Sequence, residues 1–263
     1  MKKKNVLVII LTGLIVLSGA VLGVANVYRI NSVCVQAPTV SMQAKTEAEA
    51  LKARLEEAYH GENAWFATRD FADEIVADFP YFRITSFEKA YPNRIIVEVT
   101  EDAEYFALPT VETNQTYYIL NVDGTVLDIR SDMKNRVDGY DNLLITGLSV
   151  TGEKGENLPG DPLLETAVSL CGKLSQLFDG IRRNIVKIEV MKPTSSIEES
   201  VLRVHMREGV ILYVENPTSK TEEKAQMAFD KYMGISSAQR LHGTIAVVDG
   251  ENGVLAEYFQ EEW

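Results

Sequence analysis

The feature that most constrains this chain is an apolar run of 20 residues near its N-terminus, from Val6 to Ala25, in which no residue is charged. As a helix, about 20 residues are as long as the hydrocarbon core of a bilayer is thick. Three consecutive lysines precede the run, which predicts that the N-terminus lies in the cytoplasm. We therefore expect a cytoplasmic tail over residues 1–4 and a membrane-spanning helix over 5–27. The rest of this single-pass cell-membrane protein would lie outside the cytoplasm.

A cleaved signal peptide is the alternative interpretation of the same run. Gly23-Val24-Ala25 has the small-residue pattern of a cleavage site. The apolar part of such a peptide is usually roughly 7–15 residues long, so the length of this run favours an uncleaved anchor.

Composition excludes several classes of protein. The chain has 26 basic and 38 acidic side chains, and without the three N-terminal lysines the remainder has 23 and 38, a formal charge of −15. This acidic balance argues against nucleic-acid binding, which depends on lysine and arginine. Two cysteines and three histidines are too few for a disulfide framework or a cysteine- and histidine-rich metal centre.

The first part of the outer region predicts a small α+β domain over residues 28–103. Strand patterns at 28–36, 82–87 and 94–100 surround two helical patterns, the first with a capping box at Thr46 and Glu49 and the second over 68–78. The order is β-α-α-β-β. We expect a three-stranded sheet with two helices on one face.

The remainder, residues 104–263, predicts a β-rich domain with two or three helices. Asp123-Gly124 indicates a hairpin, and Asp161 followed by Pro162 indicates the start of a helix. The other expected elements are strands at 185–191, 201–206, 210–214, 244–248 and 254–259 and a helix at 221–233. The predicted fold class is therefore α+β, with one N-terminal transmembrane helix and two outer domains.

No combination of residues in the sequence indicates catalysis. Ser86 and Lys89 have the S-x-x-K spacing of some serine enzymes, but their segment alternates like a strand, which places them on opposite faces. His205 is expected on the solvent-exposed face of a strand. We expect no catalytic residue, no metal site and no cofactor, and hence a protein that is not an enzyme.

Several segments carry a family resemblance. In the first domain they are Gly61-Glu62-Asn63-Ala64-Trp65-Phe66, Phe79-Pro80-Tyr81-Phe82 and Tyr91-Pro92-Asn93-Arg94-Ile95-Ile96-Val97-Glu98-Val99-Thr100-Glu101. Looser matches are Tyr117-Tyr118-Ile119-Leu120-Asn121-Val122-Asp123-Gly124, Leu143-Leu144-Ile145-Thr146-Gly147-Leu148 and Gly243-Thr244-Ile245-Ala246-Val247-Val248-Asp249. Together with the apolar run, this ordered set resembles the bacterial division proteins FtsQ and DivIB, whose first outer domain is a POTRA domain.

The resemblance implies a scaffold that spans the membrane once and supports septum formation. Its partners would be other division proteins similar to FtsB or DivIC and to FtsL, and no nucleic acid or small-molecule substrate is implied. A terminal edge strand could accept a strand from such a partner. The expected partner-binding residues are Val254, Leu255, Ala256, Glu257, Tyr258 and Phe259.

Two other hypotheses remain open from the sequence. One is a membrane-anchored extracytoplasmic enzyme or ligand-binding protein, which would need a deep pocket lined by titratable groups. The other is a POTRA-containing protein of secretion or sporulation, with the same fold and different partners. A strand 254–259 that is packed inside the sheet would also remove the proposed docking edge.

Overall fold

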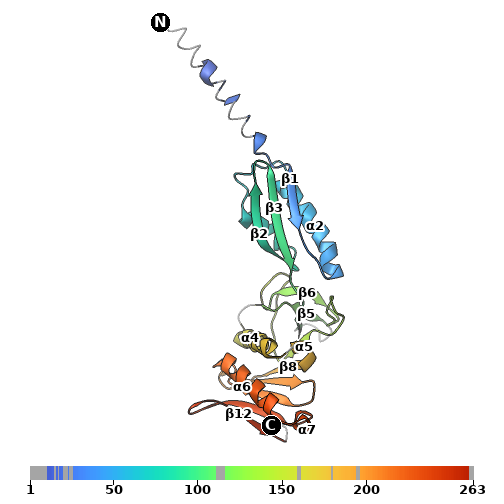
Figure 1. Cartoon of the computed structure of the whole chain (residues 1–263), viewed down its shortest axis with the longest axis vertical. Helices are drawn as coiled ribbons and strands as arrows, with labels where there is room; N and C mark the ends of the chain where they lie inside the picture. Colours follow the sequence, from blue (N-terminus) through green and yellow to red (C-terminus); the bar gives the residue numbers. More distant parts are fainter. Residues whose placement is uncertain are drawn as a thin grey trace. The chain divides into compact units, whose positions relative to one another are not determined.

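A computed structural model describes residues 11–14, 16, 18–19, 23, 26–110, 116–158, 161–178, 180–193 and 196–260. The chain divides into two compact units, unit 1 over Met1–Asp102 and unit 2 over Ala103–Trp263. Figure 1 shows the elements of both units in sequence colours, from blue to red.

The predicted membrane-spanning helix over 5–27 is corrected by the structure. Among the described residues, no helix is both long enough and apolar enough to cross a membrane. A span needs about 20 consecutive apolar residues. Helix α2 has 18 residues but carries lysines and glutamates along its length, and the more apolar α4 has only 16. The predicted tail over 1–4 and much of the apolar run lie outside the described residues.

Unit 1 has the predicted order of elements. It consists of β1 (Ser32–Gln36), α2 (Met42–Tyr59), α3 (Arg69–Val76), β2 (Phe82–Ala90) and β3 (Arg94–Glu101). The strand order is β1-β3-β2, with β1 parallel and β2 antiparallel to β3 (Figure 1). Alternate residues of β3 are buried with the apolar positions of the helices, so the period-2 and helical patterns of the sequence meet in one small core.

Helix α2 starts earlier than the sequence predicts. Ser41 is its N-cap, and the Ser41 hydroxyl accepts a hydrogen bond from the Ala44 N–H at 3.1 Å. The Glu101 carboxylate accepts from the Ser41 N–H as well, at 3.1 Å. Thr46 lies inside the helix and donates to the Met42 carbonyl, so the predicted capping box at Thr46 is wrong. A carboxylate on a distant strand supplies the charge that favours the earlier start.

Unit 2 is built on a mixed sheet of nine strands. Its order is β12-β11-β10-β9-β8-β7-β4-β5-β6. The strands are β4 (Phe106–Pro109), β5 (Tyr117–Leu120), β6 (Val126–Arg130), β7 (Leu143–Thr146), β8 (Ile185–Met191), β9 (Val201–Met206), β10 (Ile211–Glu215), β11 (Thr244–Gly250) and β12 (Gly253–Phe259). The pairs β4–β7, β7–β8 and β10–β11 are parallel, and the remaining pairs are antiparallel.

The described residues of unit 2 form more helices than expected. They are α4 (Pro162–Leu177), α5 (Ile181–Asn184), α6 (Thr221–Gly234) and α7 (Ser237–Arg240). The sequence predicted two or three helices. It did not reveal single turns such as α5, because four residues are too few to show a helical period. The apolar faces of α4 and α6 join one continuous core with the sheet. Cys171 of α4 is buried there, and this burial raises the pKa of its thiol.

Candidate docking strand

Strand β12, which holds all six predicted partner-binding residues, lies at one edge of the nine-stranded sheet. The opposite edge is β6, whose first residue is hydrogen-bonded to a later loop. The Val126 N–H donates to the Glu156 carbonyl at 2.9 Å, and the Gly155 N–H donates to the Val126 carbonyl at 2.8 Å. Within the described residues no strand lies beyond β12, so β12 is an edge of this sheet that is open for pairing.

The six residues alternate between two faces of the sheet. Val254 belongs to the core, and Ala256 and Tyr258 pack against it. Leu255, Glu257 and Phe259 therefore lie on the other face, where the Leu255 side chain is 54% exposed. The strand thus contributes one row of side chains to folding and one row to the surface.

The hairpin turn decides which backbone groups of β12 point outward. Gly250 pairs with Gly253 across a two-residue turn, and the pair that closes such a turn is hydrogen-bonded. Counting from that pair, residues 255, 257 and 259 bond to β11, whereas 254, 256 and 258 direct their N–H and C=O groups away from it. The Val254 N–H accordingly donates to the Glu223 carboxylate of α6 at 3.5 Å. The N–H and C=O groups of Ala256 and Tyr258 are therefore the ones that the open edge offers to a partner strand.

A buried lysine holds the hairpin of β11 and β12 near its turn. Lys224 of α6 is fully buried, and its Nζ donates to the carbonyls of Glu215 and Asn216 at 2.8 and 2.7 Å. The same Nζ donates to the Asp249 carboxylate of β11 at 2.8 Å. Neither Lys224 nor Glu223 was predicted from the sequence to support this strand. For Lys224 a signal existed, because it shares a helical stripe with Ala228 and Tyr232.

The other end of β12 is held by a close backbone approach. The Tyr258 hydroxyl donates to the His242 carbonyl at 3.1 Å. Gly243 has φ +89, and a Cβ there would lie 2.4 Å from the Phe259 carbonyl oxygen. Only glycine fits this position. The absence of a side chain at residue 243 allows the chain leading into β11 to lie against the end of β12. Tyr258 therefore has a structural role, which makes it a poor residue for testing partner binding.

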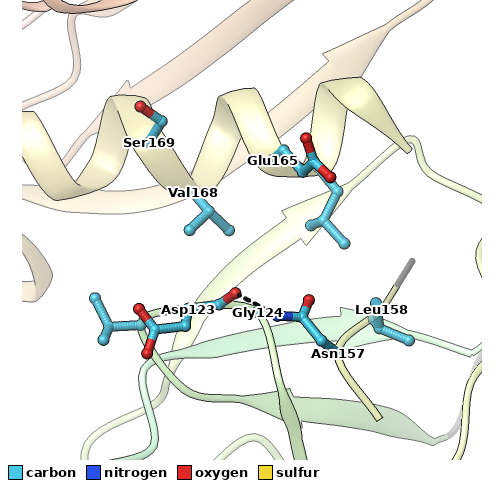
Figure 2. Close-up of a pocket in the computed structure, with 9 residues that line it drawn as sticks. Asp123, Gly124, Asn157, Leu158, Glu165, Val168 and Ser169 are labelled. Carbon is cyan, nitrogen blue, oxygen red and sulfur yellow. Dashed lines mark hydrogen bonds between the residues drawn. The ribbon is translucent and has the colours of Figure 1, made fainter. Parts of the chain in front are cut away.

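A cleft of about 250 Å³ lies between α4 and the turn that joins β5 to β6 (Figure 2). In Figure 2, Val168 points from α4 toward the turn of Asp123 and Gly124, whereas the Ser169 hydroxyl points away. Asn157 is tied to the turn because its Nδ2 donates to the Asp123 carbonyl at 3.4 Å. The described residues that line the cleft include two carboxylates, Asp123 and Glu165, and no histidine, cysteine or lysine. Asp123 and Glu165 are therefore the titratable side chains of the cleft, and the Ser169 hydroxyl turns away from it.

Other ionisable groups of unit 2 serve the fold. Tyr232 donates to the Glu208 carboxylate at 2.8 Å, and burial followed by this carboxylate raises the tyrosine pKa to about 12. Among the described residues, no group of three or more His, Cys, Asp and Glu side chains is placed to hold a metal ion.

His205 is less exposed than predicted. Its Nε2 lies 3.3 Å from a Glu189 carboxylate oxygen, and its side chain is half-buried beside Lys187 and Arg203. Burial lowers the pKa of His205, the Glu189 carboxylate opposes this shift, and the two cations reinforce it.

This lowered pKa predicts a pH dependence of stability. Below about pH 6.5 the unfolded chain takes up a proton at His205 before the folded chain does. The free energy of unfolding should therefore fall as the pH drops from about 6.5 to the folded pKa and change no further below it. Urea unfolding across this range should show a smaller slope for His205→Asn than for the unchanged chain. His60→Asn, a change at an exposed position, is the control, and an equal slope change for both variants would contradict the prediction.

Comparison with known proteins adds no assignment, because neither protein-family models nor the curated proteins give a match to this chain.

Proposed function

We propose that this chain is a non-catalytic protein of the bacterial division machinery, of the FtsQ/DivIB type, which acts outside the cytoplasm at the division septum. Its role is to hold other division proteins, similar to FtsB or DivIC and to FtsL, beside one another. The β-α-α-β-β order of unit 1 and the segments that resemble this family support the proposal.

The observation that carries the proposal is the open edge of β12. A partner segment in an extended conformation would bond to the outward N–H and C=O groups of Ala256 and Tyr258 and extend the sheet by one strand. Its side chains would lie beside Leu255, Glu257 and Phe259 on one face. Backbone bonds would provide affinity, and these side chains would provide specificity.

Replacing Ala256 with proline is expected to weaken partner binding by about tenfold or more, which corresponds to about 1.4 kcal/mol. Proline removes an outward N–H and places its ring where the added strand would lie. The ladder to β11 should survive, because residue 256 does not donate to it. The measurement is the dissociation constant between the purified chain and the DivIC- and FtsL-like proteins of the same organism.

Ala256→Val is the matched control, since valine keeps the N–H and has a similar volume to proline. It should bind the partners like the unchanged chain. Equal binding by the folded proline and valine variants would rule out pairing at this edge. Native circular dichroism for both variants shows that the comparison is between folded proteins.

Depletion of the chain in its own host tests the division role directly. A fluorescent fusion should collect at the septum, and depletion should give elongated cells with few septa. A fusion distributed evenly over the cell, together with normal cell length after depletion, would contradict the proposed function whatever the result of the binding measurement.

A further inference from the structure

Three aromatic side chains of unit 1 form a cluster that the docking role does not use. Tyr28, Trp65 and Tyr91 pack edge to face or tilted, with ring centroids 5.4 to 6.0 Å apart in all three pairs. Three separate segments bring them together. The Ala64 N–H donates to the Tyr28 carbonyl at 2.8 Å, and the Asn31 N–H donates to the Asn93 carbonyl at 3.0 Å. The cluster is therefore a built part of the fold.

Two of these three rings, Trp65 and Tyr91, are exposed and Tyr28 is partly exposed, although aromatic rings of this size are usually buried. Trp65 is 60% exposed and the adjacent Phe66 is 81% exposed, and both Tyr91 and Val27 are also exposed. We call Val27, Tyr28, Trp65, Phe66 and Tyr91 the aromatic patch. Val27 and Phe66 adjoin Tyr28 and Trp65 in the chain. Exposed apolar side chains grouped in this way mark a contact with a partner or a lipid surface.

Cations surround the aromatic patch in a chain that is acidic overall. The Lys89 ammonium donates to the Trp65 carbonyl at 3.1 Å, and the Arg29 guanidinium donates to the Gly61 carbonyl at 2.9 Å. Arg94 begins β3 three residues after Tyr91 and is exposed. The loop that contains Gly61 and Trp65 also contains a carboxylate, that of Glu62. Tryptophan and tyrosine next to lysine and arginine are the residues that favour the headgroup layer of a bilayer.

The sequence that leads into the aromatic patch is also compatible with lipid. Only Asn26 separates the uncharged apolar run of residues 6–25 from Val27 and Tyr28. Residues 26 and 27 are helical and residue 28 lies in a turn, and three residues at a helical rise of about 1.5 Å each span only about 5 Å. Any apolar surface that receives the run therefore lies within reach of the patch.

We propose that the aromatic patch rests in the headgroup layer of a lipid bilayer, with Trp65 and Phe66 at the acyl-chain boundary and Arg29, Lys89 and Arg94 beside the phosphates. The contact concerns the bilayer surface and needs no spanning helix. It would hold this end of unit 1 at the lipid surface and leave the far end of β3 away from it.

Trp65 itself provides the test, because the chain has two tryptophans and Trp263→Phe leaves Trp65 alone. The full chain carrying this change is mixed with phosphatidylcholine vesicles whose acyl chains are brominated near the headgroup, and the vesicles are floated. Trp65 emission in the floated fraction should shift to shorter wavelength and fall by about twofold or more relative to unbrominated vesicles.

A second tryptophan position in the same unit is the matched control. Met42 is 74% exposed and adjoins Ser41, which bonds to Glu101 at the opposite end of β3 from Arg94. Seven residue steps of a strand separate these ends by about 23 Å. In the Trp65→Phe, Trp263→Phe, Met42→Trp variant, the emission should not change with bromination.

Four results would overturn the proposal. Equal quenching at positions 42 and 65 would indicate unspecific adsorption. Failure of the chain to float, or unquenched Trp65 in floated chain, would show that the aromatic patch does not meet lipid. A shift of Trp65 emission only when the DivIC- and FtsL-like proteins are added would assign the patch to a protein interface instead.

Discussion

Replacing Arg130 with methionine is expected to destabilise unit 2 by about 3–5 kcal/mol, the usual cost of leaving a buried charge without its partner. Arg130 and Glu104 form two parallel bonds of 2.7 and 2.8 Å, and their side chains are only 9% and 2% exposed. Glu104 also accepts from the Arg136 N–H and from Asn142 Nδ2 at 3.0 and 3.3 Å. Without the guanidinium, a carboxylate in the interior would lose its counter-charge.

A neighbouring surface pair is the matched control for this variant. Arg136 lies 3.3 Å from Asp132 in the same loop, and both side chains are more than 40% exposed. Arg136→Met should cost less than about 1 kcal/mol. Urea unfolding followed by hydrogen exchange of unit 2 peptides measures this unit separately from unit 1. A similar small loss for Arg130→Met would show that the buried pair does not stabilise the fold.

The second large effect is expected at Gly147, where alanine should destabilise unit 2 by about 3 kcal/mol or more. Gly147 follows the last residue of β7 and has φ +86, which L-residues rarely adopt. A Cβ there would lie 1.9 Å from the Val190 carbonyl oxygen of β8. Because that atom belongs to the backbone of a central strand, the parallel pair β7–β8 would have to separate.

Gly139→Ala separates the two causes of this loss. Gly139 also has a positive φ, +71, but a Cβ there meets nothing within 4 Å. It should cost about 1–2 kcal/mol, the conformational penalty alone. The same unfolding measurement applies, and equal losses for the two alanine variants would show that the contact with Val190 is unimportant.

Local chemistry explains what could be predicted from the sequence. Alternating residues such as Ile95, Val97 and Val99 defined β3, and Asp161 with Pro162 defined the start of α4, where the Asp161 side chain accepts from the Leu163 N–H at 2.9 Å. Asp123-Gly124 likewise marked the turn between β5 and β6. These signals act over a few residues, so one sequence is enough to find them.

Long-range pairing explains what could not be predicted. Strands β4 and β7 have four residues each, too few to show a pattern, and they pair in parallel with distant neighbours. The start of α2 depends on Glu101, some 60 residues later. The sequence indicated that residues 254–259 form a strand, but the edge position of β12 follows only from the order of all nine strands.

The parallel pairing of β10 with β11 has a consequence for the order of folding. Strands β8, β9 and β10 are joined by short antiparallel connections, whereas β11 reaches β10 only after α6 and the rest of residues 216–243 have been placed. Long-range pairing is the slower step, so β10 should spend time as the temporary edge of the sheet. A partner strand that arrives early would then pair with β10 instead of β12. The timing of assembly, as well as the finished surface, would therefore decide which edge is extended.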